Sequence, residues 1–129
     1  MQRAKIYIAG RYSNLSALVE ERKKYWEAGL EITSSWLDNK EDGMTFDDVA
    51  ILDLGDVQRA NTLVLYTEPY GTAVPGGGRH VEFGYALGLG KEICIVGPHE
   101  NIFHWHPAVH VFPRTEYCIR YLKTKEYNV

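Results

Sequence analysis

One stretch of the chain carries residues whose types and order could do chemistry. It begins with a glycine triplet, Gly76, Gly77 and Gly78, which Arg79 follows directly. Glu82 lies in the helical pattern that comes next, and an apolar run from Ile93 to Val96 predicts a buried strand after it. In an open α/β sheet, a glycine-rich loop of this kind lies at the carboxyl ends of the strands and can bind an anion through backbone N–H groups. We therefore expect the triplet and Arg79 to bind substrate.

Glu82 is the first candidate for the reacting group. The pattern places it in the first turn of its helix, where its carboxylate would face the cleft and the helix dipole would favour the ionised form. The alternative is an ordinary solvated acid on a helix surface.

A second group of residues that we expect to bind substrate follows the first predicted strand. It comprises Gly10, Arg11, Tyr12 and Ser13. Tyr7 lies within that strand and Asp53 within a later helix, so both can reach the same mouth of the sheet as Glu82. Two carboxylates and a phenol suit a reaction in which one acid attacks or activates while the other transfers a proton. Asp53 could equally be a solvated acid and Tyr7 a plain core residue.

The glycine loops match no established nucleotide-binding signature. Backbone donors from the triplet and the Arg79 guanidinium could hold a phosphate, or the glycines could simply give a flexible loop. The triplet is neither a P-loop nor a complete dinucleotide fingerprint, and Gly10 stands alone after its strand. We therefore expect no cofactor.

Four histidines gather near the end of the chain, at His99, His104, His106 and His110. No acid or cysteine accompanies them at ligand spacing, so we expect no metal site. His80 and Glu82 match the His-x-Glu of zinc deaminases, but the Pro-Cys-x-x-Cys partner is missing. Phe103 and Trp105 could form a platform that stacks a planar base, or could pack against a second subunit.

The elements that must position these residues alternate along the chain. Strands are predicted from Lys5 to Gly10, Leu30 to Leu37, Thr62 to Tyr66, around Ile93 to Val96 and from Val109 to Phe112. Helices are predicted from Leu15 to Ala28, capped by Ser13 or Asn14, from Thr45 to Ala60 with a possible break at Gly55, around Glu82, and from Thr115 to about Lys125. This alternation predicts an α/β, flavodoxin-like three-layer fold with a five-stranded parallel sheet in the order 2-1-3-4-5. That order brings the Gly10 loop beside the loop that leads to Glu82.

Composition limits the classes of protein. With 129 residues and 45% hydrophobic content, we expect one domain over residues 1–129. The net charge of −3 comes from interspersed acids and bases, so neither a nucleic-acid polymer nor a membrane is an expected partner. Cys94 and Cys118 are expected to be reduced residues in or near the core. The N-terminus has too short an apolar run for a signal peptide, and we expect a cytoplasmic protein.

Three sequence blocks carry a resemblance to a known family. They are Ile6 to Gly10, Asp53 to Asn61, and Val81 to Ala86 together with Gly90 and Lys91. In this order and spacing they resemble the nucleoside 2-deoxyribosyltransferase family, which includes the deoxynucleoside-monophosphate N-glycosidases.

The resemblance implies a role for each of three side chains. Glu82 would attack C1′ of the sugar and form a glycosyl-enzyme ester, Asp53 would protonate or hold the leaving base, and Tyr7 would orient Glu82. It also implies a homodimer or higher homo-oligomer in which a neighbouring subunit completes each site.

The chain departs from the family pattern at two positions. Asn61 stands where the family usually has Asp, and Gly76 stands six residues before the glutamate, where transferases often have Asp and monophosphate glycosidases Ser. Arg11 and Arg79 would suit a 5′-phosphate. A nucleoside transferase, a nucleoside 5′-monophosphate hydrolase and a non-catalytic nucleotide-binding module therefore all remain open.

Overall fold

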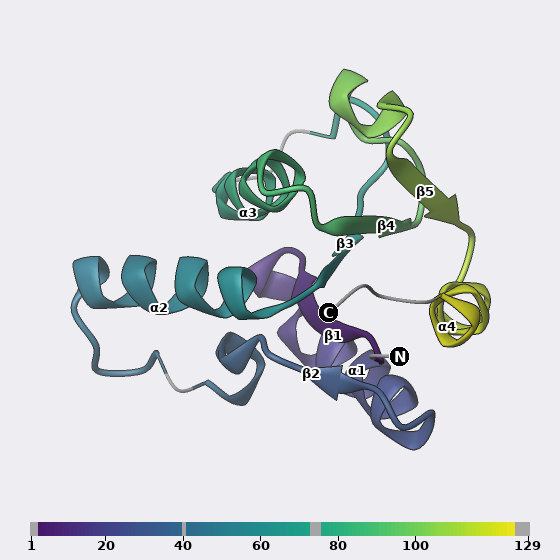
Figure 1. The fold of residues 1–129 in the computed structure, drawn as a ribbon. Coiled ribbons are helices and arrows are strands. Elements are labelled where there is room, and N and C mark those ends of the chain that lie inside the picture. The colour runs from purple at the N-terminus through teal and green to yellow at the C-terminus, as the bar shows by residue number, and fades with distance from the viewer. Residues whose placement is uncertain (1–2, 40, 73–75, 126–129) are drawn as a thin grey trace.

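A parallel sheet of five strands forms the centre of the computed structural model, which describes residues 3–39, 41–72 and 76–125 (Figure 1). Its strands are β1 (Lys5–Ala9), β2 (Glu31–Ile32), β3 (Thr62–Tyr66), β4 (Glu92–Val96) and β5 (Val109–Phe112). All neighbours pair in parallel in the order β2-β1-β3-β4-β5, which confirms the predicted flavodoxin-like topology.

Helices cover both faces of the sheet. They are α1 (Leu15–Glu27), α2 (Phe46–Arg59), α3 (Gly78–Gly88) and α4 (Thr115–Thr124). Figure 1 shows α2 and α3 side by side on one face, with α1 and α4 on the other. Because both faces are covered, the inner strands are apolar through their centres: Leu63 to Leu65 and Ile93 to Ile95 are fully buried. Cys94 and Cys118 are free thiols in this core, as the sequence predicts.

The second strand is shorter than predicted. The sequence predicts a strand from Leu30 to Leu37, but β2 ends at Ile32 and a 3₁₀ helix covers Ser35–Asp38. Side-chain bonds replace the strand ladder here, since Ser34 Oγ accepts from Ile8 N at 3.1 Å and Trp36 Nε1 donates to Ile8 O at 2.8 Å. The chain therefore turns along the carboxyl edge of the sheet, and Trp36 remains buried there.

The helix boundaries bring two further corrections. The possible break at Gly55 does not occur: α2 continues through it, and the next two residues, Asp56 and Val57, are buried. Thr45 caps this helix and accepts from Asp48 N at 3.4 Å. Asn14 does stand at the start of α1, but its side chain makes no cap bond and donates to Glu68 at 3.1 Å instead.

Among the described residues, no helix combines the length and the apolar character that a bilayer crossing requires.

Candidate active site

A pocket opens at the carboxyl edge of the sheet, where β1 and β3 lie next to each other. Its lining residues are Gly10, Arg11, Tyr12, Trp36, Glu41, Asp53, Gly76, Gly78, Arg79 and Glu82. Most of the predicted site residues therefore meet in one place. Tyr7, Ser13 and Gly77 are outside this lining: Tyr7 is buried beneath it, while Ser13 and Gly77 are exposed.

Glu82 reaches the pocket from the second turn of α3, one turn later than predicted. The influence of a helix dipole fades beyond the first turn, so the expected preference for the ionised form does not hold. Burial instead raises the pKa of Glu82 to about 7, and the nearby charges of Glu41 and Asp56 act in the same direction. The carboxyl group is consequently close to half-ionised at neutral pH.

Tyr7 opposes part of that shift. Its O–H, from the fully buried middle of β1, donates a short hydrogen bond to Glu82 Oε2, which lowers the pKa of Glu82. The pKa of the Tyr7 phenol is itself raised far above its usual range, first by burial and then by the Glu82 charge. Tyr7 is therefore a permanent hydrogen-bond donor. Its bond fixes Oε2 of Glu82 and does not involve Oε1.

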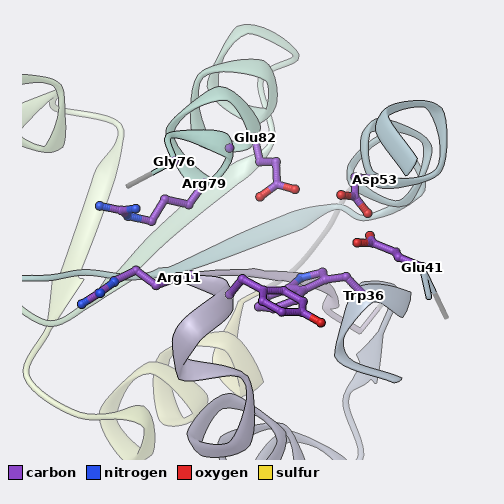
Figure 2. Close-up of a pocket in the computed structure, with 10 residues that line it drawn as sticks. Arg11, Trp36, Glu41, Asp53, Gly76, Arg79 and Glu82 are labelled. Atoms are coloured by element: carbon purple, nitrogen blue, oxygen red, sulfur yellow. The ribbon is translucent and has the colours of Figure 1, made fainter. Parts of the chain in front are cut away.

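Asp53 comes from α2, the helix beside α3, and lines the same pocket as Glu82 (Figure 2). Figure 2 shows its carboxyl group directed at that of Glu41, with the Glu82 carboxyl group pointing toward both. Burial, the neighbouring Glu41 carboxyl group and then the charge of Glu82 together raise the pKa of Asp53 to about 8. Asp53 is therefore mostly protonated at neutral pH.

Trp36 and Glu41 are pocket residues that the sequence reasoning missed. Trp36 was expected inside a strand and Glu41 in an ordinary polar loop. Their position just after the second strand was the available signal, since ligands bind beyond the carboxyl ends of parallel strands. Trp36 packs against Tyr12 with ring centroids 6.3 Å apart, and the two form an aromatic wall.

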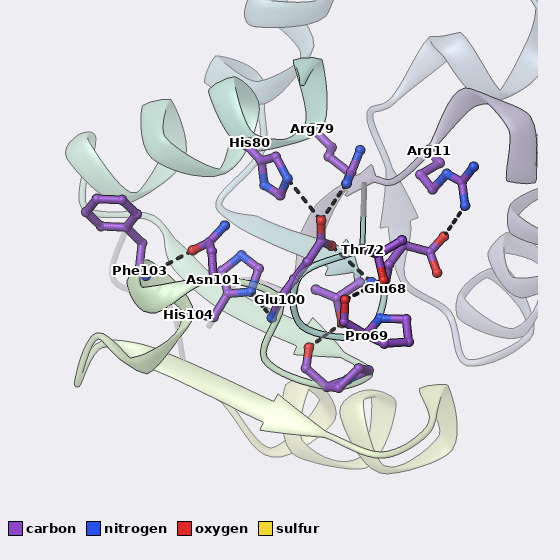
Figure 3. Close-up of polar contacts among 12 residues, drawn as sticks. Arg11, Glu68, Pro69, Thr72, Arg79, His80, Glu100, Asn101, Phe103 and His104 are labelled. Carbon is purple, nitrogen blue, oxygen red and sulfur yellow. Dashed lines mark hydrogen bonds and ion pairs between the residues drawn. The ribbon is translucent and has the colours of Figure 1, made fainter. Parts of the chain in front are cut away.

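Both predicted arginines line the pocket, and both hold carboxylate partners (Figure 3). Arg11 Nη1 lies 2.9 Å from Glu68 Oε1. Arg79 pairs with Glu100, and each of these two side chains is only 4% exposed. His80 Nε2 also lies 3.1 Å from Glu100, whose other oxygen accepts from Glu68 N at 3.0 Å. The network ties the loops after β3 and β4 together.

The predicted glycines differ in what they permit. Gly76 has φ of +79°, in the left-handed region that favours glycine, and Gly77 and Gly78 begin α3. At Gly10, an added Cβ would lie 2.7 Å from Leu18 Cδ1, so this glycine allows α1 to pack closely against the end of β1.

None of the four clustered histidines lines the pocket. His99 stacks on Trp105 with centroids 3.5 Å apart, and the buried His104 accepts from Glu100 N through Nδ1 at 2.9 Å. His110 Nε2 lies 3.3 Å from Glu92 Oε1. Within residues 3–39, 41–72 and 76–125, no group of three or more His, Cys, Asp or Glu side chains is placed to hold a metal ion. Phe103 and Trp105 are exposed and do not line the pocket, so the predicted aromatic platform is not part of it.

Comparison with known proteins identifies the fold. No protein-family model and no curated protein sequence matches the chain. Among solved structures, it is similar to a 2-deoxyribosyltransferase from Leishmania mexicana, with a TM-score of 0.74 and 16% identity over 96% of this chain and 99% of the other. A 2-deoxyribosyltransferase from Bacillus psychrosaccharolyticus gives a TM-score of 0.73 and 18% identity, with 92% of each chain covered. A CMP N-glycosidase from Clostridium botulinum gives 0.61 and 18%, covering 94% of this chain and 99% of the other. The resemblance noted in the sequence is thus confirmed at the level of the fold.

Proposed function

We propose that the protein cleaves the N-glycosidic bond of a nucleoside or deoxynucleoside and transfers the sugar, through an ester on Glu82, to another base or to water. One observation carries this proposal: Tyr7 holds one oxygen of Glu82 inside a pocket that Asp53 also lines. The similar folds of two deoxyribosyltransferases and a CMP N-glycosidase support the same class of reaction.

In the first step, Glu82 acts as the nucleophile. Its ionised carboxylate attacks C1′ through Oε1, while Tyr7 keeps its hydrogen bond to Oε2. The bond between C1′ and the base nitrogen breaks, and its electron pair leaves with the base. Asp53 donates its proton to that base, so the products are a neutral base, a glycosyl ester and an ionised Asp53.

In the second step, the ester is broken. A second base or a water molecule attacks C1′, gives its proton to the Asp53 carboxylate and displaces Glu82. The enzyme returns to its starting protonation state, and the configuration at C1′ is retained because it has been inverted twice.

The pocket offers a surface for each part of a nucleoside. The Tyr12 and Trp36 wall suits stacking of a planar base, and the glycine loop at Gly76 and Gly78 leaves room for the sugar. A nucleoside 5′-monophosphate is the second candidate substrate, because Arg11 and Arg79 line the pocket. A neutral nucleoside is the first choice, since both guanidinium groups already bind carboxylates and three further acids line the same pocket.

A homodimer or higher homo-oligomer is part of the proposal. Phe46 and Ile51 on α2 and Val81 on α3 are large apolar side chains that are well exposed in the single chain. Exposed apolar groups on adjoining helices are typical of an interface between subunits. Light scattering after size-exclusion chromatography measures the mass, and a monomer at micromolar concentration would contradict this part.

Product analysis tests the function. The protein is incubated with nucleosides, deoxynucleosides and their 5′-monophosphates, with and without a second free base, and the products are identified by chromatography and mass spectrometry. We expect base release from wild type and at least a thousandfold loss in Glu82→Gln, since the lost contact acts mainly in the transition state. A quenched reaction with a 2-fluoro sugar should leave one glycosyl unit on the peptide that contains Glu82. Ligand binding without turnover, equal in Glu82→Gln, would instead indicate a non-catalytic binding module.

A further inference from the structure

The pocket wall contains two neighbouring acids, Glu41 and Asp53. The proposed reaction gives a role to Asp53 alone. Glu41 comes from the loop before α2 and Asp53 from the second turn of that helix. Figure 2 shows the two carboxyl groups directed at each other. Glu41 Oε1 and Asp53 Oδ1 are both buried, and neither has a basic or neutral hydrogen-bond donor among the described residues.

Two carboxyl groups in this position need a proton between them. Buried polar atoms are nearly always hydrogen-bonded, and a carboxylate can only accept. If both acids were ionised, two like charges would face each other in a poorly solvated wall, which is strongly unfavourable. With one proton shared, each buried oxygen gains a partner.

We propose that Glu41 is a positioning residue that shares a proton with Asp53 and thereby keeps Asp53 as the acid that protonates the departing base. The inference rests on the proposed function, because it assigns Glu41 a part in the same reaction.

The surrounding charges favour the protonated pair. Glu82 from α3 and Asp56 from the next turn of α2 add negative charge near Asp53, and Tyr7 from β1 is a neutral phenol. The two positive groups of the pocket, Arg11 and Arg79, are engaged by Glu68 and Glu100. Figure 2 shows both guanidinium groups pointing away from the three carboxyl groups. Removing the charge of Glu41 is therefore expected to lower the pKa of Asp53 and to free its proton at lower pH.

The proton balance of the reaction is unchanged by the pair. When the bond to C1′ breaks, the shared proton moves to the base nitrogen, and the pair is left with two negative charges. That state is unfavourable, so the pair readily takes the proton from the incoming base or water in the second step. Glu41 makes Asp53 both a ready acid and, after transfer, a ready base.

The test compares Glu41→Gln with Asp42→Asn, which removes a neighbouring exposed acid outside the pocket lining. The ratio kcat/KM, which reports the free enzyme, is measured from pH 5.5 to 9.5 on an ordinary purine nucleoside and on its N7-methylated form, whose cationic base leaves without a proton. We expect the alkaline limb of Glu41→Gln to move down by at least about one pH unit, a loss of about tenfold on the ordinary nucleoside at high pH. The loss on the methylated nucleoside should be much smaller, and Asp42→Asn should behave as wild type.

A second measurement does not depend on turnover. Carbon-13 NMR of the Asp side-chain carboxyl groups follows the titration of Asp53 directly, with Asp53→Asn assigning the signal. We expect Asp53 to titrate at least about one unit lower in Glu41→Gln than in wild type. An unchanged titration, or an unmoved alkaline limb in a folded Glu41→Gln variant, overturns the inference. Absence of any nucleoside cleavage by wild type overturns the proposed function alone, because the NMR titration still tests the shared proton.

Discussion

The pKa values of Glu82 and Asp53 set a pH window for the proposed reaction, and the hydrogen bond from Tyr7 to Glu82 fixes its acid side. Glu82 must be ionised to attack, and its pKa is about 7; Asp53 must be protonated, and its pKa is about 8. Activity should therefore rise as pH increases through the first value and fall as it increases through the second. We expect a bell-shaped profile of kcat/KM, which reports the free enzyme, with its maximum between these values.

Tyr7→Phe removes the bond that lowers the pKa of Glu82 and leaves the burial that raises it. A hydrogen bond to a charged group contributes about 1.5–3 kcal/mol, which corresponds to roughly 1–2 pH units. The pKa of Glu82 should therefore rise by this amount and reach or pass that of Asp53. The acid limb of the profile then moves upward, and its maximum falls. At the middle of that range, the peak fraction of enzyme with both groups correctly protonated falls about fourfold, and loss of orientation of Glu82 lowers the rate further.

The assay follows base release by absorbance across pH 5.5 to 9.5 for wild type and two variants. Tyr25→Phe is the matched control, because Tyr25 is also a buried tyrosine but bonds Tyr66 outside the pocket lining. It should leave both limbs in place. An acid limb that stays in place in Tyr7→Phe, or moves to lower pH, would refute the reasoning about Glu82, provided that circular dichroism shows an intact fold.

Two further predictions concern stability. The pKa of Asp53 is raised from 3.8 to about 8, so its contribution to stability is fully present below about pH 4 and is lost as pH rises through about 8. Asp53→Asn should therefore raise Tm relative to wild type more at pH 9 than at pH 5. The difference should be about 4 °C for each ~1 kcal/mol of unfolding free energy. Equal shifts at the two pH values would contradict this. Gly97→Ala should destabilise by ~1–3 kcal/mol, since φ is +124° and the new Cβ would lie 2.6 Å from a threonine hydroxyl oxygen. Gly84→Ala, on an open helix surface, should instead stabilise the protein by ~0.5–1 kcal/mol. Urea unfolding measures the free energy of both variants. An unchanged stability of Gly97→Ala would contradict the prediction and show that the loop after β4 relaxes freely.

Local patterns were sufficient to predict the topology. The apolar runs at β1, β3 and β4 are long and are separated by helical periods, so their type and parallel order follow from the sequence. β2 could not be predicted to its end, because Ser34 and Trp36 leave the ladder to bond Ile8, a residue 26 to 28 positions earlier. The pattern of side chains alone cannot show such a long-range contact.

The sequence predicts most residues of the candidate pocket but not their charge states. The sequence predicts that Tyr7, Asp53 and Glu82 meet at one mouth of the sheet, and the structure brings them together. The direction of the pKa shift of Glu82 depends on its burial, which the sequence does not show. The two arginines were expected to be free for a phosphate, and the acids that occupy them lie in loops after β3 and β4. Only the folded chain brings those loops together.

Trp36 gives the pocket an optical reporter of its own. It is 6% exposed in the pocket wall, whereas Trp26 and Trp105, the other two tryptophans, are 49% and 67% exposed. The emission of Trp36 should therefore lie at shorter wavelength than that of the other two, and a base stacked on the wall should quench it. In a Trp26→Phe/Trp105→Phe double variant, the fluorescence of Trp36 would report the binding of each substrate and the release of each product. No label on the protein or the ligand is needed.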